Sequence, residues 1–590
     1  MNLKKYLIPE YVLVFLVSMG YMVGVLNTYH RFPSTGNIYP NLVAIMFSAF
    51  GLLHWYAVRP IKRWSLSVIA WLVVFLLVLV QPFISSITYP DGMIFSLAIL
   101  LFCIAFSLCL SNVELQQREK LYLILVGFLI VTATLTVVTQ LLQYLKLDLP
   151  RSIIFPNFSQ TRIGSNLGQP NQASFVLSLG VAGLLYLTSK TKRLAVSLLL
   201  IFPVAFLALG LGLTASRTGI ILMIVALLGY LLLFHVPIRY KITVSTVALV
   251  LLVVGYLGGS QLLSSYNNMT MNSVERLSDG TINLRWYQLQ QAAIIFNDNK
   301  LTGVGWGNLL GTSVHYAQEL PWFAATAHTH FFASQIAVET GIIGLLTLCP
   351  FIYILLSNFS FRLSNYQAAV YTMLAIFVAY SCSEFPLWLP MYLVVFVMLL
   401  SLVNHRSHNL SKQLRVLGKS VWLVFSIMLV IGSIYYQVQY RSYSNIYYTL
   451  TESSLNQEEK IERLAIHSPV YGFEKFDDIF LFYLMSLDKV GLEHKRELAD
   501  KVLSQSVSYP ILTKTANIYL LAGQKEKALT LLKAACTFNR AKECPVLAQE
   551  MTQSASVGSN DLKWLNMQFQ AWRQANPQKT GVTIKSNFKQ

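Results

Sequence analysis

The residues best suited to proton transfer are two histidines, one residue apart, in the segment from Ala327 to Gly344. His328 and His330 stand where an apolar stretch begins, and Glu339 follows within that stretch. The H-x-H spacing could bring two imidazoles to a metal, but no H-E-x-x-H pattern or cysteine cluster supplies further ligands. A neutral histidine can accept a proton from a hydroxyl nucleophile, so we expect acid–base chemistry without a metal or another cofactor.

Two arginines beside apolar segments, Arg217 and Arg285, could bind a negatively charged group. Arg217 lies in TASRTG, between two strongly apolar stretches with almost no loop around it. Its guanidinium either reaches the lipid headgroups or holds a phosphate with its planar fork, and the sequence leaves both interpretations open. Arg285 precedes WYQLQQ, where a solvent-exposed surface charge is the more common role.

Amide side chains gather in RIGSNLGQPNQASF, where Gln169 and Asn171 flank Pro170. Exposed backbone N–H groups at the start of a helix attract anions, although an ordinary turn that begins a helix has the same composition. Glu384 opens a later apolar stretch and could pair with one of the arginines. The predicted substrate-binding residues are therefore Gln169, Asn171, His328, Glu339 and Glu384.

The composition indicates that these residues are carried by helices that cross a membrane. Hydrophobic residues make up 55% of the chain and charged residues only 12%, and the mean hydropathy is +0.54. A soluble domain carries about a quarter charged residues. We predict an all-α polytopic fold of about thirteen transmembrane helices, at residues 9–27, 39–58, 64–81, 93–111, 121–145, 171–188, 194–213, 217–235, 242–258, 328–356, 366–382, 386–403 and 417–438.

The distribution of basic residues predicts the orientation of these helices. The net charge is +18, and with a cytoplasmic N-terminus seventeen Lys and Arg lie in cytoplasmic connections, against eight in the generally longer connections opposite. This bias predicts a cytoplasmic N-terminus and an exported C-terminus. The candidate histidines, arginines, amides and Glu384 then all face the exported side. No strongly basic domain remains to bind nucleic acid.

Four regions follow from this topology. Residues 1–258 hold helices one to nine, 259–327 form an exported insertion, 328–438 hold helices ten to thirteen, and 439–590 form a soluble tail. The insertion contains a predicted helix, LRWYQLQQAAIIF, followed by the glycine cluster GVGWGNLLG. The tail contains a pattern that resembles a tetratricopeptide-like helix pair. Such a tail could contact a protein, cap the membrane site or serve only for packing.

The tail also contains two cysteines, Cys536 and Cys544, which are the candidates for a disulfide. Along one straight helix they would be about 12 Å apart, too far for a bridge. The intervening TFNRAKE and the following Pro545 could form a turn that brings them together. A disulfide and two unpaired thiols both remain open.

An ordered set of motifs resembles a known family. GSNLGQPNQAS, LTASRTG, the run from LRWYQ to LTGVGWGN, HTHFFASQIAVETGIIG and SEFPLW occur in family order across residues 160–390, and HRFP and the helical tail extend the likeness. They resemble the bacterial O-oligosaccharyltransferases of the PglL type, relatives of the WaaL O-antigen ligases and, more distantly, of the Wzy polymerases. Members transfer a preassembled glycan from undecaprenyl diphosphate to a Ser or Thr hydroxyl of a protein, often a pilin.

The resemblance implies an enzyme of the bacterial inner membrane whose active site faces the periplasm. Its partners would be a lipid-linked glycan donor, an acceptor protein and membrane lipid, with no nucleotide or metal. By position, His330 corresponds to the essential histidine of the family, and Arg217 and Arg285 to its arginines. Two residues depart from the pattern: Phe331 stands where members usually have Asn, and Tyr380 replaces a histidine before the E-x-P-L motif.

Two other functions are compatible with a polytopic chain. An O-antigen ligase acting on the lipid A core is the nearer alternative, although the soluble tail suits a protein acceptor better. A lipid or solute transporter would carry polar residues deep within several spans and show internal repeats, and the sequence contains neither.

Overall fold

The described part of the chain is mostly helical, as the sequence predicts. The computed structural model describes residues 8–30, 38–157, 161–191, 193–266, 284–319, 323, 325–360, 362–404, 406–450, 454–467, 471–538 and 559–576. Within these ranges the only strands are β1 (Arg63–Ser65) and β2 (Ser407–Asn409), which pair antiparallel with Arg63 opposite Asn409.

Two compact units alternate along the sequence. The first comprises Met1–Phe75, Ala98–Thr281 and Leu348–Ser444, and the second Leu76–Leu97, Ile282–Thr347 and Asn445–Gln590. The insertion and the tail, predicted as separate regions, therefore belong to one unit. The residues after the predicted boundary at 328 belong to the same unit, up to Thr347.

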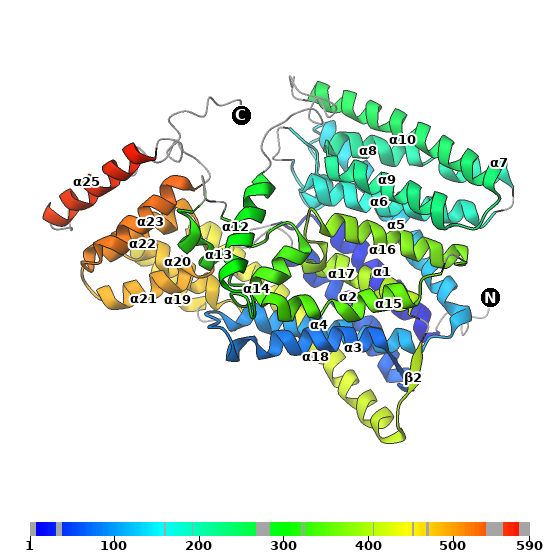
Figure 1. The fold of residues 1–590 in the computed structure, drawn as a ribbon, viewed down its shortest axis with the longest axis horizontal. Helices are drawn as coiled ribbons and strands as arrows, with labels where there is room; N and C mark the ends of the chain where they lie inside the picture. Colours follow the sequence, from blue (N-terminus) through cyan, green and yellow to red (C-terminus); the bar gives the residue numbers. More distant parts are fainter. Residues whose placement is uncertain are drawn as a thin grey trace. The chain divides into compact units, whose positions relative to one another are not determined.

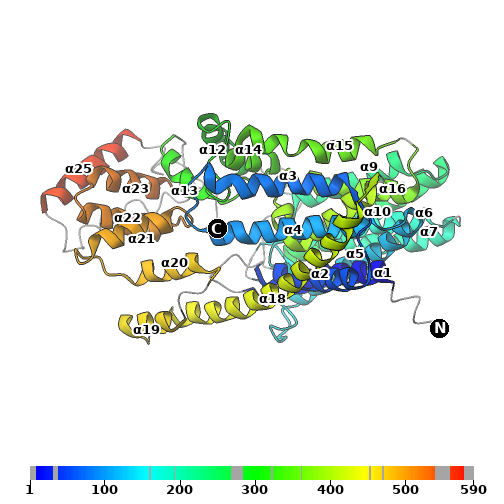
Figure 2. The same ribbon diagram turned by 90° about the horizontal axis from the view of Figure 1, so that it is seen from below.

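The first unit holds most of the apolar helices (Figure 1). Within it, α1 packs against both α2 and α5, and Figure 2 shows these three helices side by side. The helices that lie wholly or partly in this unit are α1 (Pro9–Leu26), α2 (Ile38–Val58), α3 (Leu66–Val80), α4 (Pro90–Ser111), α5 (Leu115–Tyr144), α6 (Pro170–Ser189), α7 (Leu194–Ile201), α8 (Val204–Thr214), α9 (Arg217–Leu233), α10 (Ile238–Tyr266), α15 (Cys349–Ser357), α16 (Asn365–Ser381), α17 (Pro390–Val403) and α18 (Lys412–Leu450).

The contact between α8 and α10 depends on glycine. A Cβ on Gly255 would lie 2.2 Å from the carbonyl oxygen of Ala205, and one on Gly259 would lie 2.0 Å from that of Leu209. Small residues let two apolar helices approach until their backbones touch, which replaces the hydrophobic driving force that is absent between helices in lipid. This packing holds α8, whose C-terminal end leads directly into the TASRTG turn.

The second unit contains the insertion helices and the tail. Successive tail helices from α19 to α23 pack each on the next, as expected for a helical-repeat pattern, and α25 packs on α23 (Figures 1 and 2). Its helices are α12 (Leu284–Asp298), α13 (Leu309–Ser313), η4 (Val314–Tyr316), α14 (Phe332–Leu346), α19 (Gln457–His467), α20 (Glu474–Leu484), α21 (Leu492–Leu503), α22 (Tyr509–Leu521), α23 (Lys525–Thr537) and α25 (Ser559–Ala575).

Several helices are suited to crossing a membrane. Among the described residues, nine are long and apolar enough, or ten if α14 and α15, which a bend separates, form one span. Each of the thirteen predicted spans overlaps helical residues, but the seventh is divided between α7 and α8 and the tenth between α14 and α15. The helices α9, α16 and α17, of 17, 17 and 14 residues, are shorter than a full span. A multi-pass membrane protein is thereby supported, and the count of thirteen crossings and their orientation stay predictions.

Helix boundaries differ from the predicted ones where proline or glycine intervenes. The helix predicted from residue 386 begins at Pro390, because Pro386–Trp388 form the 3-10 turn η5 and Leu389 is extended. A residue before proline avoids the helical region, which explains the delayed start. The predicted tenth span is not one continuous helix, since Gly341 has φ +66° and ψ −160° inside α14. The last apolar helix, α18, continues past the predicted end at residue 438 to Leu450.

Candidate functional site

The predicted site residues fall in both units. Gln169, Asn171, Arg217 and Glu384 belong to the first unit, whereas Arg285, His328, His330 and Glu339 belong to the second. The joining of Arg217 with Arg285 and His330 in one site stays a prediction, and each unit has its own polar network.

Asn171 stands at the centre of the network in the first unit. Its Oδ1 accepts hydrogen bonds from Nη2 of Arg162 (2.7 Å) and from Oγ of Ser216 (3.0 Å). Its Nδ2 donates to Oε1 of Glu384 at 2.7 Å, and Glu384 is buried. An amide can accept and donate at once, so one side chain joins three segments that are far apart in the sequence. Glu384 is thus linked through Asn171 to Arg162, whereas its pairing with Arg217 or Arg285 stays a prediction.

The turn before α9 is held by the same network. Arg162 donates through Nε to the carbonyl oxygen of Thr214 at 2.7 Å, and Ala215 has φ +46°. A non-glycine residue in the left-handed region costs roughly 1–2 kcal/mol, so the turn needs such support. Ser216 then caps α9 by accepting from the backbone N–H of Gly219 (3.1 Å). Arg217 follows as the first residue of α9, with an exposed side chain.

Gln169 is the N-cap residue of α6. Its Oε1 accepts from the backbone N–H of Gln172 at 2.6 Å, and Pro170 occupies the first helical position. Proline there is compatible with the helix because the first N–H groups have no partner within the helix. Gln169 therefore has the structural role of a residue that caps a helix start. Its contact with a substrate stays a prediction.

The irregular segment before α6 is held by amides that sequence reasoning did not single out. From α5, Gln143 donates through Nε2 to the carbonyl oxygens of Phe155 (2.7 Å) and Ser165 (2.9 Å). Gln140, one turn earlier, donates to Ile163 at 3.2 Å. Two buried glutamines three residues apart in an apolar helix are the signal that could have found them. The other residues overlooked are Arg162, Asn166, Ser216 and His30, whose ring nitrogen lies 2.6 Å from the Asn166 carbonyl oxygen.

The glycine cluster GVGWG wraps around α14 in the second unit. Its three glycines all have positive φ, and the backbone N–H groups between them reach α14: Val304 donates to the Val338 carbonyl oxygen and Gly305 to that of Glu339, both at 2.9 Å. A Cβ on Gly303 would lie 2.3 Å from the Glu339 carbonyl carbon. Only glycine permits this close approach, which explains the cluster.

The interruption of α14 at Gly341 belongs to the same arrangement. Its φ and ψ are open essentially only to glycine, and a Cβ there would lie 2.1 Å from the carbonyl oxygen of Leu301. The following N–H, of Ile342, donates to the Lys300 carbonyl oxygen at 2.8 Å. The side chain of buried Glu339 faces the backbone N–H of Gly307 and the amide of Gln335. The insertion thereby takes up backbone groups that the interrupted helix does not satisfy.

The two histidines lie in the turn directly before α14. His328 is 9% exposed, and its Nδ1 accepts the backbone N–H of His330 at 2.9 Å. Burial and then the neighbouring His330 lower the pKa of His328 to about 3. His330 is half-buried with φ +56°, and the two rings are 5.9 Å apart. Of the two, His330 is the more accessible imidazole.

Arg285 lies in the first turn of α12 and is half-buried. This helix packs on α14 through a core of Ala292, Ile295 and Val338, to which Leu309 also contributes. Arg285 and His330 are therefore carried by elements of one packed unit. Within the described part of the chain, no group of three or more His, Cys, Asp or Glu is placed to hold a metal ion.

The two departures from the family pattern have different surroundings. Phe331 is extended at the start of α14, where its carbonyl oxygen accepts from the Gln335 backbone N–H at 3.0 Å. Tyr380 is 1% exposed, and its ring stacks on that of Phe175 with centroids 4.3 Å apart. Position 380 therefore contributes to the packing of α16 against α6.

Several contacts join the tail to the rest of the second unit. The Phe323 N–H donates to the Thr537 carbonyl oxygen at 3.0 Å, and a Cβ on Gly311 would lie 2.2 Å from the carbonyl oxygen of Ser504. Asp478 accepts from the Tyr89 hydroxyl at 2.8 Å and pairs with Lys501 at 2.6 Å. These contacts join the tail to the insertion and to the loop before α4.

The end of α23 carries the first cysteine of the predicted disulfide. Cys536 is buried and disulfide-bonded. Cys544 lies outside the described residues, so the pairing stays a prediction.

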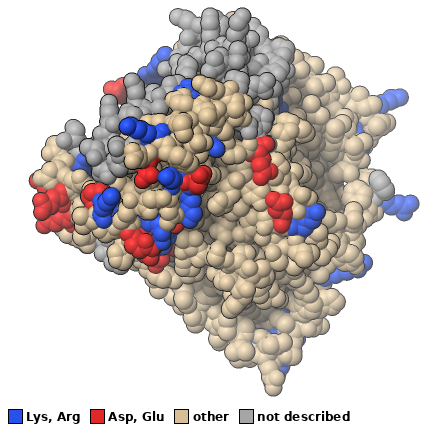
Figure 3. All heavy atoms as spheres, turned by 60° about the vertical axis from the view of Figure 1, so that its left-hand side comes forward, with Lys and Arg blue, Asp and Glu red and all other residues tan. Residues whose placement is uncertain are grey.

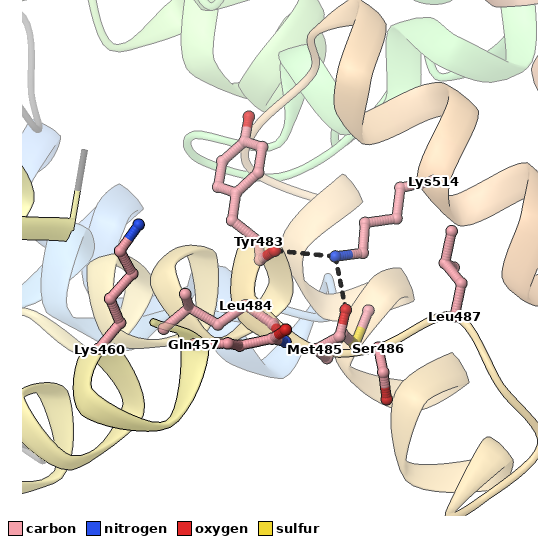
Figure 4. A pocket seen from close by; sticks show the side chains of 8 residues that line it. All are labelled: Gln457, Lys460, Tyr483, Leu484, Met485, Ser486, Leu487 and Lys514. Carbon is pink, nitrogen blue, oxygen red and sulfur yellow. Dashed lines mark hydrogen bonds between the residues drawn. The ribbon is translucent and has the colours of Figure 1, made fainter. Parts of the chain in front are cut away.

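A pocket of about 420 Å³ lies in the tail, between α19, the C-terminal end of α20 and α22 (Figure 4). Lys514 donates to the carbonyl oxygens of Tyr483 (2.9 Å) and Met485 (2.7 Å), which α20 leaves unsatisfied at its end. Burial and the charge of Lys495 lower the pKa of Lys514 to about 8. With Lys460, the lining carries two lysines and no carboxylate.

Charged side chains of both signs gather over the tail helices on the face seen in Figure 3. Most of the other described surface on that face carries none, as expected where apolar helices meet lipid.

Two family models match consecutive regions of the chain. Residues 202–349 match the model described as O-antigen ligase, and residues 368–544 match the C-terminal region of virulence factor membrane-bound polymerases. Arg217, Arg285 and His330 fall in the first region, and Glu384 falls in the second. These two regions are similar to O-antigen ligases and to membrane-bound polymerases, and the several apolar helices are those of a multi-pass membrane protein.

One protein that is similar to this chain has a more specific description. The chain is 24% identical over 516 residues to a protein described as general O-oligosaccharyltransferase of Acinetobacter baylyi, and the match covers 82% of this chain and 85% of the relative. The resemblance predicted from the ordered motifs is thereby confirmed.

The network around Asn171 makes a prediction about stability. Replacing Asn171 by Leu removes three hydrogen bonds, two accepted by Oδ1 and one donated by Nδ2, and leaves buried Glu384 without this bond. The expected cost is about 1–3 kcal/mol for each buried group affected. We expect the midpoint of thermal unfolding in detergent to fall by several degrees. Asn517→Leu is the matched control, because among the described residues the Asn517 amide bonds only to the Thr513 carbonyl oxygen of its own helix. Equal midpoints for the two variants would contradict the role of the network.

Proposed function

We propose that this protein transfers a preassembled glycan from an undecaprenyl diphosphate carrier to a Ser or Thr hydroxyl of a periplasmic protein, a pilin in the first instance. The observation that carries this proposal is the similarity to a general O-oligosaccharyltransferase over most of both chains. The match of residues 202–349 to the O-antigen ligase model supports it, since this region contains the proposed catalytic residues.

In the proposed reaction, the acceptor hydroxyl attacks the anomeric carbon of the glycan directly. The new bond joins this carbon to the acceptor oxygen, and the bond to the carrier phosphate breaks. His330 takes the hydroxyl proton, and Arg217 and Arg285 stabilise the charge that develops on the departing diphosphate. One displacement without a glycosyl–enzyme intermediate inverts the anomeric configuration. The energy comes from the phosphate bond of the donor, so the proposal needs no nucleotide or metal.

The position of Arg217 supports a role in binding phosphate. Its backbone position at the N-terminus of α9 adds the partial positive charge of a helix start to the charge of the guanidinium. Asn171, Glu384 and Arg162 act on this site by holding the turn that carries Arg217. Gln169 and Asn171 are also the candidates for orienting the carrier or the sugar, and Glu339 lies beside the loop before α13.

The tail pocket supports a protein acceptor. Lys460 and Lys514 supply positive charge, Gln457 and Ser486 supply hydrogen-bonding groups, and Leu484 and its neighbours supply apolar surface. A segment of polypeptide with an acidic side chain beside an apolar one has the complementary chemistry.

An O-antigen ligase is the second candidate function, because the family model bears that description. The two functions differ in what carries the glycan afterwards. Mass spectrometry of pilin and other periplasmic proteins, from cells with and without this chain, separates them. We expect glycopeptides to disappear with the gene; their persistence, together with loss of glycan from the lipid A core, would favour the ligase.

His330→Ala tests the proposed base. Transfer in membranes is expected to fall by about 10²- to 10⁴-fold, the range that a positioned proton acceptor contributes. The matched control is His315→Ala, because His315 is an exposed histidine in the same unit. Unimpaired transfer by the His330→Ala variant at equal protein level would exclude His330 as the base.

Arg217→Lys separates the two interpretations of this arginine. Lysine keeps the charge but not the planar fork, so loss of a charge-assisted hydrogen bond should lower transfer by about tenfold or more. Arg239→Lys is the control, since Arg239 is exposed in the first turn of α10. Near-normal activity of the Arg217→Lys variant would favour contact with lipid headgroups instead.

Lys460→Glu tests whether the tail pocket receives the acceptor. Reversing one charge at its lining should lower kcat/KM for a protein acceptor by about fivefold, or roughly 1 kcal/mol, with the KM for the lipid-linked donor unchanged. Lys563→Glu makes the same charge change on an exposed position of α25. Equal effects of the two variants would exclude the pocket as the acceptor site.

A further inference from the structure

His328 and His330 are held in different ways. His330 has a backbone φ of +56°, in the left-handed region that a residue with a side chain rarely adopts. Its backbone N–H donates to Nδ1 of His328 at 2.9 Å. The side chain of one histidine thus binds the main chain of the other, at the residue whose backbone is strained.

The main chain that carries the acceptor ring makes hydrogen bonds of its own. The backbone N–H of His328 donates to Oγ1 of Thr326 (3.1 Å), and that hydroxyl donates to the His328 carbonyl oxygen (2.6 Å). The next N–H, of Thr329, donates to Oε1 of Gln335 on α14 at 2.8 Å. The main chain is therefore bonded on both sides of His328, which fixes the backbone position from which the ring reaches His330.

The protonation state of His328 suits a permanent acceptor. A nitrogen that accepts an N–H carries no proton, so the ring proton lies on Nε2. Because burial and the nearby His330 lower its pKa to about 3, the ring stays neutral at any pH well above that value. The charge of such a group does not change near neutral pH, and its Nδ1 can accept the His330 N–H there.

We propose that His328 is a positioning residue, whose Nδ1 holds the main chain of His330 in the left-handed conformation and so directs the His330 imidazole toward the acceptor hydroxyl. The inference rests on the proposed function, in which His330 takes the proton, and it gives His328 a task other than the predicted contact with substrate. Without this bond the backbone of His330 relaxes toward negative φ, and its ring moves away from the reacting oxygen.

Three substitutions of His328 test this role in the full-length protein. The Oδ1 of His328→Asn falls near the position of Nδ1 and can accept the N–H, the carbonyl oxygen of His328→Gln reaches the position of Nε2, and His328→Leu has no acceptor. We expect the Asn variant to keep most of kcat. The Gln and Leu variants should lose about 10²-fold in kcat, the cost of a misplaced catalytic group. The KM for the donor and the pH profile should be unchanged in the Asn variant.

Other outcomes overturn the proposal. Activity in the Gln variant but not in the Asn variant would mean that Nε2 contacts the substrate. A rise in KM with unchanged kcat would restore the predicted role in substrate binding. Equal activity of all three variants with the unmodified chain would show that the bond does not matter.

A second measurement does not depend on activity. Diethyl pyrocarbonate modifies accessible neutral imidazoles, and mass spectrometry follows its addition to His330 in each variant. We expect the rate of addition to His330 in the Asn variant to equal that in the chain with His328, and the rate in the Leu variant to differ severalfold. If His330→Ala retains activity while the rates follow this order, the proposed base is wrong and the positioning stands. Identical rates in all variants would exclude the positioning whatever the activity.

Discussion

Backbone N–H and C=O groups outside helices need hydrogen-bond partners wherever water is excluded, and this constraint decides which residues surround the candidate site. In the first unit the irregular segment before α6 is satisfied by buried amides, as when Gln143 binds the carbonyl oxygens of Phe155 and Ser165. In the second unit glycine-rich backbone pairs directly with the interrupted helix α14. Irregular backbone within a membrane protein is tolerated only where other parts of the protein surround it. The candidate catalytic and binding residues lie on or beside these surrounded segments.

Each unit has a residue with strained backbone at or near a candidate catalytic residue. Ala215 is left-handed two residues before Arg217, and His330 is itself left-handed. Strain of this kind persists where surrounding bonds outweigh its cost, and it is common at functional sites. Arg162 and Asn171 supply those bonds in one unit and His328 supplies one in the other. Both turns are therefore fixed by hydrogen bonds, and electrostatic stabilisation of a leaving group and proton transfer both depend on groups held in place.

Sequence reasoning selected candidate site residues by their type, but it did not predict which residues they bond to. Asn171 and Glu384 were predicted as substrate-binding residues, and they are bonded to each other across more than two hundred residues. Arg162 was overlooked although it lies in the same motif, because nothing in the motif shows that its guanidinium reaches Thr214. Hydrogen bonds between distant segments depend on how helices pack, and helix packing leaves little trace in local composition.

The sequence by itself determined where the helices lie, because apolar runs of spanning length and prolines at helix starts act locally. It also predicted the resemblance to O-oligosaccharyltransferases from the order of short motifs, and the similarity to the Acinetobacter baylyi protein confirms that resemblance. Only the tertiary structure decided that the insertion and tail form one unit, that α14 breaks at Gly341 to receive the glycine loop, and that the ring of His328 binds the backbone of His330. Each of these depends on contacts at bonding distance, which residue types alone do not specify.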